Sequence, residues 1–304
     1  MILNMKIPVG DFMERVINWM TTNFSDGFDA IKNGLEAIID SMNWFLLAIP
    51  IVIFIIVVTF LAWWIAGNGI ACFTALGLLL IQNLGLWKQT MQTLSLVTTA
   101  TLIAILLGLP LGILMAKSNK ANIIIRPILD FMQTMPAFVY LIPAVYFFDL
   151  GTVPGAVATI IFAMPPIVRL TNLGIRQVPK DVVEAAKSFG STSSQLLFKV
   201  QVPLAIPTVL AGLNQTIMLS LSMVVISAMI GADGLGNIVL QGITQMKMGQ
   251  GFEGGLAVVI IAMVLDRVTQ CLGKASPKSG KAFITKIKNK NKNRIGSRNL
   301  EPAD

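Results

Sequence analysis

The sequence predicts an all-α membrane protein. Three observations indicate this class: the 304 residues are 55% hydrophobic and only 12% charged, the mean hydropathy is +0.75, and a long charge-free stretch covers residues 200–232. A soluble domain of this length needs far less apolar surface to fill one core. The apolar runs are continuous rather than alternating with period two, which favours membrane-crossing helices over the strands of a barrel.

About seven helical spans are expected, within a range of six to eight, because a helix needs about 20 residues to cross roughly 30 Å of hydrocarbon. Dividing the apolar stretches at their Gly, Pro and polar residues gives spans at residues 44–65, 70–86, 91–116, 128–148, 154–168, 208–230 and 254–272. The second span is the least distinct, because only residues 67–69 separate it from the first.

Residues 1–43 are expected to form an external, amphipathic N-terminal segment. Two apolar stripes recur at helical spacing on either side of Gly27: Phe12, Val16, Trp19 and Met20, then Phe28, Ile31, Leu35, Ile38 and Met42. This pattern predicts two amphipathic helices that lie on the outer membrane surface or pack against the transmembrane core. A small soluble cap is the alternative.

The basic residues predict the orientation of the chain in the cell membrane. If residues 117–126, residues 169–199 and everything after residue 266 are cytoplasmic, all but five of the 23 Lys and Arg lie inside, as the positive-inside rule expects. An odd number of spans then puts the N-terminus outside and the C-terminus in the cytoplasm.

The C-terminal segment, residues 274–304, is expected to be a basic cytoplasmic tail. It holds nine Lys and Arg among Pro, Ser, Gly and Asn, a composition typical of a solvated segment attracted to anionic membrane lipid. Binding to nucleic acid is not expected, because Phe283 is the tail's only aromatic residue that could stack on bases.

The composition excludes several kinds of chemistry. The chain has no His, and its two Cys, Cys72 and Cys271, lie singly in apolar spans. We therefore expect no catalytic residues and no metal site. Because no glycine-rich loop is followed by Lys and Ser or Thr, the chain should bind no ATP by a P-loop and no cofactor. Energy for transport would have to come from a partner.

An ion-coupled carrier is an alternative, and it would place an ionisable group near the middle of the membrane. The acidic residues near the predicted spans all lie within a few residues of a span end: Asp130, Asp149, Asp233, Glu253 and Asp266. We interpret Asp266 as one half of a charge pair with Arg267 at the cytoplasmic end of the last span.

Residues 169–203 form a charged, amphipathic island between two apolar stretches. The run Glu184, Ala185 and Ala186 is followed by three residues and Gly190, and after nine more residues by Val-Gln-Val-Pro, which ends in Val202 and Pro203. The acidic residues near its start and Gly190 at its end predict a short helix over residues 179–189. Its small Ala side chains would let another protein approach, and Glu184 would offer that protein a charge. An ordinary loop helix is the alternative.

This spacing resembles the EAA motif in the coupling loop of ABC importer permeases, whose general pattern has Ile and Leu in place of Val200 and Val202. Residues 133–143, 151–155, 164–171 and 229–236 further resemble the permease subunits for glycine betaine, proline betaine, carnitine and choline. The resemblance covers about residues 87–268. It implies a type I ABC importer transmembrane domain over residues 44–273, with its coupling loop at 169–203.

The resemblance also implies a function. The chain would be the transmembrane subunit of an ATP-driven importer that moves glycine betaine or a related quaternary-ammonium compatible solute into the cell for osmoprotection. The implied partners are an ATPase subunit that uses ATP and Mg, a separate external substrate-binding protein and a second copy of the permease. Permeases for amino acids such as methionine share the coupling loop and are the main alternative.

One face of the sixth span is a candidate translocation pathway. It carries Gly212, Thr216, Ser220, Met223 and Ser227. Small residues in membrane helices also serve helix packing, which is the alternative. Trp63 and Trp64 could form an aromatic cage for a quaternary ammonium, but tryptophans at a span end are typical of the interfacial belt.

Overall fold

The structure of the protein is a computed structural model that describes residues 8–275. All regular structure in this range is helical, which confirms the predicted class. The helices are α1 (Val9–Asn23), α2 (Ser25–Ala48), α3 (Ile51–Ala66), α4 (Asn68–Asn83), α5 (Trp87–Lys117), α6 (Asn119–Thr134), α7 (Leu141–Phe148), α8 (Thr152–Arg176), α9 (Lys180–Ser188), α10 (Ser193–Gln195), α11 (Val202–Ala228), α12 (Leu235–Thr244) and α13 (Met248–Ala275). The predicted basic tail lies outside the described residues, apart from residues 274 and 275.

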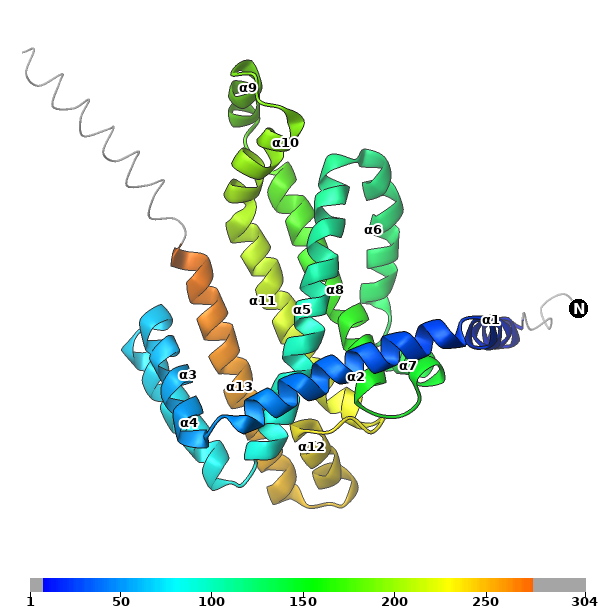
Figure 1. The fold of residues 1–304 in the computed structure, drawn as a ribbon, viewed down its shortest axis with the longest axis vertical. Coiled ribbons are helices and arrows are strands. Elements are labelled where there is room, and N and C mark those ends of the chain that lie inside the picture. The colour runs from blue at the N-terminus through cyan, green and yellow to red at the C-terminus, as the bar shows by residue number, and fades with distance from the viewer. Residues whose placement is uncertain (1–7, 276–304) are drawn as a thin grey trace, which may run out of the picture.

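Four long helices, α5, α8, α11 and α13, form the body of the molecule and run roughly side by side (Figure 1). Each is long and apolar enough to cross a membrane. Figure 1 shows α9 and α10 at one end of this body and α12 at the other, with α2 lying across the long helices. We call the two ends the α9 end and the α12 end.

Two of the predicted spans are not single straight helices. The apolar run at residues 44–65 is divided between α2 and α3, whose axes differ by 99°. The run at residues 128–148 bends by 110° between α6 and the segment Ala137–Phe148, which is a 3-10 turn (Ala137–Tyr140) followed by α7. Each break contains a proline, Pro50 or Pro136, preceded by an extended residue. Proline disfavours helical geometry in the residue before it, so the helix ends there although the apolar run continues.

The number of spans is at the lower limit of the predicted range. Counting each bent pair as one span gives up to six in the described chain. The apolar run at 70–86 is α4, which has 16 residues and is shorter than the roughly 20 that a straight span needs. Helices α3 and α4 form a hairpin that returns to the α12 end, where α5 begins (Figure 1).

The N-terminal helices are attached to the body by specific contacts of α2. The ammonium of Lys32 lies 2.6 Å from the Asp149 carboxylate, and the Phe28 ring stacks on Phe147 at 4.5 Å between centroids. Nearer the body, the Ser95 hydroxyl donates a hydrogen bond of 2.7 Å to the carbonyl of Ile39. Of the two predicted arrangements, packing against the transmembrane core is therefore the one that α2 adopts.

Helix α8 is the centre of the body, and glycines let its neighbours approach closely. A Cβ atom added to Gly112 of α5 would lie 2.7 Å from the Val168 carbonyl oxygen, and one added to Gly212 of α11 would lie 3.3 Å from the Pro166 carbonyl oxygen. Such contacts between small residues drive helix association in membranes, where apolar burial alone gives little preference for another helix over lipid.

Replacing Gly112 by Ala should therefore destabilise the protein, because the new methyl group meets the backbone of α8, which cannot move aside. Overpacking of this kind costs about 1–3 kcal/mol, so the melting temperature of the purified protein in detergent should fall by several degrees. Gly34→Ala is the matched control: its Cβ meets nothing within 4 Å, and Ala favours a helix by roughly 0.5–1 kcal/mol over Gly. A Gly112→Ala protein that melts no lower than the wild type would contradict the close α5–α8 contact.

Candidate functional site

The helix predicted around Glu184 is α9. It begins at Lys180, directly after Pro179, whose extended backbone makes it the N-cap rather than the first helical residue. Asp181 lies in the first turn and Lys187 in the last, so both charges are favourably placed in the field of the helix dipole. The island therefore forms a helix through local signals that are present in its own sequence.

The end of α9 depends on Gly190. Its φ angle is +81°, a left-handed conformation that favours glycine. The Gly190 amide donates to the carbonyl of Lys187 at 2.9 Å, and the Ser191 amide donates to Ala186 at 3.1 Å. This pair of hydrogen bonds is the Schellman motif, which satisfies the last carbonyls of a helix and reverses the chain. A Cβ on Gly190 would meet nothing within 4 Å, so the requirement is for backbone conformation, not for space.

One surface of α9 is not covered by any other part of residues 8–275. No residue of α9 is buried, and Glu184 and Ala185 are exposed while Ala186 is half-buried. Two apolar side chains at this end are also exposed, Val182 at 39% and Phe189 at 91%. Exposed apolar groups beside a charge that no partner neutralises are typical of a protein–protein contact. The helix is therefore suited to insertion into the surface of another protein.

A second set of contacts fixes the loop to the body. A capping box between Thr192 and Gln195 starts α10, and a π-helix over Leu196–Gln201 leads into α11. Leu197 of this π-helix is buried with Ile175 and Ala205, and Val202 packs against the same cluster. Val202 and Pro203 form the first turn of α11. The segment that follows α9 is thus packed against the end of α8 and the start of α11.

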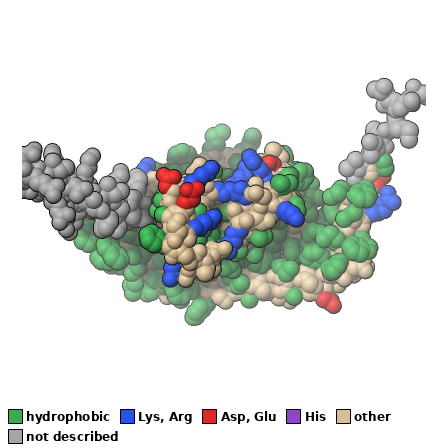
Figure 2. Space-filling model, turned by 90° about the horizontal axis from the view of Figure 1, so that it is seen from above, with side chains coloured by type: hydrophobic (Ala, Val, Ile, Leu, Met, Phe, Trp, Pro, Cys, Tyr) green, Lys and Arg blue, Asp and Glu red, His purple; other side chains and the backbone are tan. Residues whose placement is uncertain are grey.

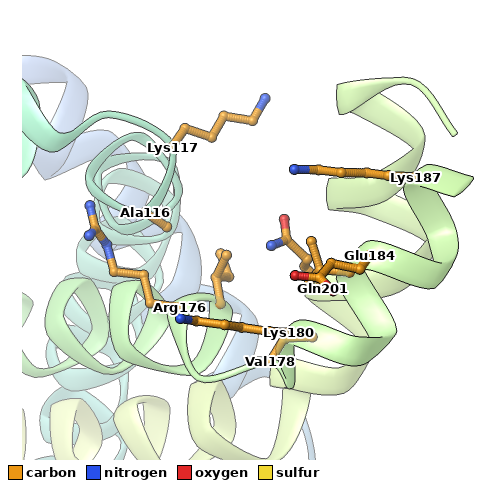
Figure 3. Close-up of a pocket in the computed structure, with 10 residues that line it drawn as sticks. Ala116, Lys117, Arg176, Val178, Lys180, Glu184, Lys187 and Gln201 are labelled. Carbon is orange, nitrogen blue, oxygen red and sulfur yellow. The ribbon is translucent and has the colours of Figure 1, made fainter.

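A crevice of about 310 Å³ separates α9 from the ends of α5 and α8. Figure 3 shows the Lys117 and Lys187 side chains extending into it from opposite sides, with Gln201 and Glu184 below them in this view. Seen from the α9 end, Figure 2 shows Lys and Arg side chains gathered on this face. The position of Lys117 was not predicted, because it comes from a helix about 60 residues earlier and no local pattern relates the two segments.

The pathway residues predicted on α11 are packed inside the chain. Thr216, Ser220, Met223 and Ser227 are fully buried, and Gly212 lies against α8. The hydroxyls of Thr101 and Ser220 are hydrogen-bonded at 3.0 Å, and the hydroxyl of Ser227 donates to the Gly155 carbonyl at 3.4 Å. In this conformation the face joins α11 to α5 and α8. Its role in translocation stays a prediction.

The sequence suggested that Asp266 pairs with Arg267, but in the structure its partners are other residues. Its carboxylate accepts hydrogen bonds from Asn214 at 2.9 Å and from Gln270 at 2.8 and 2.9 Å. The Thr269 hydroxyl also lies 2.7 Å from the Asn214 amide oxygen. The acid therefore joins α13 to α11, and the neutral amides around it have the geometry of a structural contact.

Substitutions at Gly190 should separate the conformational requirement from a steric one. Gly190→Val should loosen the end of α9, because a β-branched residue is strained at positive φ. Amide hydrogen exchange in residues 185–191 should then become faster. Gly190→Asn should preserve most of the protection, because Asn tolerates the left-handed conformation. Equal exchange in both variants and the wild type would show that the turn does not depend on Gly190.

Comparisons with known proteins agree with this fold. The structure resembles two inward-facing forms of the MetNI methionine ABC transporter. One match has a TM-score of 0.58 at 18% identity and covers 64% of this chain and 96% of the other. The second has a TM-score of 0.56 at 20% identity, covering 61% and 93%. At this identity the likeness shows the fold, which is that of a type I ABC importer transmembrane domain, as predicted.

Sequence relatives are much more similar. The glycine betaine transport system permease protein OpuAB of Bacillus subtilis is 53% identical over 265 residues, which are 87% of this chain and 94% of the relative. The glycine betaine/carnitine transport permease protein GbuB of Listeria monocytogenes is 52% identical, with coverages of 88% and 96%. The glycine betaine/proline betaine transport system permease protein ProW of Escherichia coli is 50% identical, with coverages of 90% and 77%.

Residues 108–277 match the family described as binding-protein-dependent transport system inner membrane component. This range includes α9, its Gly190 turn and the connection into α11. The chain therefore belongs to the family of binding-protein-dependent transport system inner membrane components, as a multi-pass permease subunit of an ABC transporter.

Proposed function

We propose that this chain is the transmembrane subunit of an ATP-driven importer that moves glycine betaine or a related quaternary-ammonium compatible solute into the cell, for osmoprotection. The observation that carries the proposal is the identity of 50–53% to permeases named for glycine betaine, over 87–90% of this chain. The matches to the methionine transporter have 18–20% identity and support the fold without favouring an amino acid as the solute.

The proposed coupling site is the α9 loop, with Glu184, Ala185, Ala186 and Gly190 at the contact and Val202 and Pro203 at its connection to α11. An ATPase subunit would cover the exposed surface of α9, where Phe189 and Glu184 lie free of other parts of the chain. ATP binding would draw two ATPase subunits together, and each would carry its docked α9. Because the loop is packed against α8 and α11, its movement would change their tilt and convert the permease between inward- and outward-facing states.

The importer would contain two copies of this permease, two ATPase subunits and an external substrate-binding protein. This chain would have no enzymatic activity and hold no cofactor, and ATP and Mg would be used by the ATPase. The α9 end would face the cytoplasm, because Lys and Arg gather there (Figure 2) and the positive-inside rule applies. The hairpin of α3 and α4 returns to the α12 end, so it does not change the side of the membrane on which the chain lies before α5. The N-terminus would therefore be outside, and the C-terminus would be in the cytoplasm.

The proposed domain organisation follows from this orientation. Residues 1–43 would form the external amphipathic segment, residues 44–273 the transmembrane domain with its coupling loop at 169–203, and residues 274–304 a cytoplasmic tail attracted to anionic lipid. Helix α2, which crosses the boundary at residue 43 without interruption, would connect the external segment mechanically to the membrane domain.

Uptake of radiolabelled glycine betaine into proteoliposomes tests this function. The vesicles would hold this chain, the ATPase and the binding protein, with and without internal ATP. We expect ATP-dependent accumulation that Glu184→Ala and Gly190→Asp abolish, because the first removes the charge of the docking surface and the second puts a negative charge at the C-terminal end of α9, where the helix dipole disfavours it. Binding of solute to the isolated binding protein should be unchanged.

The matched control is Glu14→Gln, which changes an exposed acid on α1, far from the loop in the sequence, and should transport normally. Uptake that needs no ATP would favour an ion-coupled carrier instead. Normal uptake by the Gly190→Asp variant would remove the coupling assignment while leaving the solute assignment intact.

A further inference from the structure

Helix α6 has a polar face that the membrane alone does not explain. Asn122, Arg126, Asp130 and Gln133 recur at intervals of three or four residues and so lie on one side of the helix. The other side carries exposed apolar residues: Ile124, Ile128 and Phe131. A helix with this division lies between lipid and water, or between lipid and a polar cavity.

The polar face of α6 lines a groove of about 550 Å³. Its opposite walls are the second half of α8, from Pro166 to Arg176, and Gln215 of α11. The volume is many times the roughly 30 Å³ that one water molecule occupies in the liquid. The ten residue-to-residue steps from Pro166 to Arg176 rise about 15 Å along the helix, which is about half the thickness of the hydrocarbon layer. The groove thus extends from the α9 end to about the middle of the body.

The charged residues that line the groove differ in whether they have partners. Arg169 lies 2.5 Å from Asp130 in an ion pair. Arg176 donates to the amide oxygens of Asn172 and Asn119, both at 2.9 Å, and to the Met115 carbonyl at 2.7 Å. Arg126 lines the groove and has no ion-pair or hydrogen-bond partner among residues 8–275. The groove therefore presents one uncommitted guanidinium beside a paired acid and base.

Polar and ionisable side chains within the hydrocarbon layer cost free energy unless they face water, and they mark routes for polar solutes. We propose that the groove is the cytoplasmic half of the solute route and that Arg126 receives the carboxylate of a zwitterionic solute. This inference rests on the proposed function and extends it to a substrate class and a specificity-determining residue. A guanidinium matches a carboxylate in geometry and charge. Arg126 is exposed, and water reaching it through the groove would keep the interaction weak enough for release.

The pair of Asp130 and Arg169 offers complementary charges to the same solute. A quaternary ammonium has no N–H to donate, so its attraction to the Asp130 carboxylate would be purely electrostatic. A zwitterion lying along α6 could place its carboxylate at Arg126 and its cation toward Asp130, one helical turn away. A solute with the cation alone would lack the contact with Arg126.

The first experiment asks whether the groove contains water, and it does not depend on the identity of the solute. In the assembled importer, Cys72 and Cys271 are replaced by Ala, and single cysteines are introduced as Gln133→Cys and Gln215→Cys. A membrane-impermeant methanethiosulfonate reagent is applied to the cytoplasmic side of everted vesicles. Both positions should react, whereas Ile124→Cys, 65% exposed on the apolar side of α6, should not. Reaction of the groove cysteines in detergent but not in vesicles would mean that lipid fills the groove, and would overturn the proposal.

The second experiment tests Arg126 itself. Arg126→Gln should lower the maximal rate of glycine betaine uptake by about tenfold at saturating solute-loaded binding protein, since a charged hydrogen-bond partner of the entering carboxylate is lost. ATP hydrolysis stimulated by the binding protein should fall less, and Arg126→Lys should restore part of the uptake. Lys120→Gln is the matched control, because it removes one exposed positive charge from the same helix outside the groove.

The outcomes distinguish this inference from the proposed function. If the wild-type importer takes up no quaternary amine, the solute assignment fails, while labelling at positions 133 and 215 still decides whether the groove is a water-filled route. If the wild type transports glycine betaine and Arg126→Gln equals Lys120→Gln, the function stands and the role of Arg126 is wrong.

Discussion

The close contact of α8 with α5 and α11 is the constraint on which the rest of the structure depends. Gly112 and Gly212 let both neighbours approach the backbone of α8, and no large side chain could occupy either position without separating the helices. The α9 loop begins at the end of α8 and ends at the start of α11. Because these two helices are held together along their length, the force that the proposed coupling would exert on α9 would act on a rigid pair rather than on two independent helices.

The sequence was informative wherever structure depends on neighbouring residues. The long apolar helices, the Glu184 helix and its end at Gly190 all follow from local patterns, and all are present. The bends at Pro50 and Pro136 were missed because the apolar runs continue through them. Asp130 and Arg169, which pair across 39 residues, could be brought together only by the packing of α6 on α8. The small residues of α11 had two interpretations, and only the neighbouring helices show which surface they contact in this state.

The two polar regions of the body have different electrostatic character. Around Asp266, neutral amides accept and donate in a closed network, so the acid is held by fixed partners between α11 and α13. In the groove beside α6, a partly exposed set of charges faces open space. Groups whose hydrogen bonds are all made within the protein keep their partners when a solute arrives, whereas groups that face open space can exchange a protein partner for the solute. This contrast explains why only the second region is suited to a passing ligand.

The exposure of Phe189 has a consequence for the life of the protein before assembly. A newly made chain carries this ring at the end of α9, 91% exposed within the described structure. Exposed aromatic groups are recognition features for chaperones and proteases and promote aggregation. If an ATPase subunit docks on α9 as proposed, a chain that lacks this partner would be marked for removal by the surface that an assembled chain uses. The stoichiometry of the complex could then be enforced through degradation of unpaired subunits, without a separate signal.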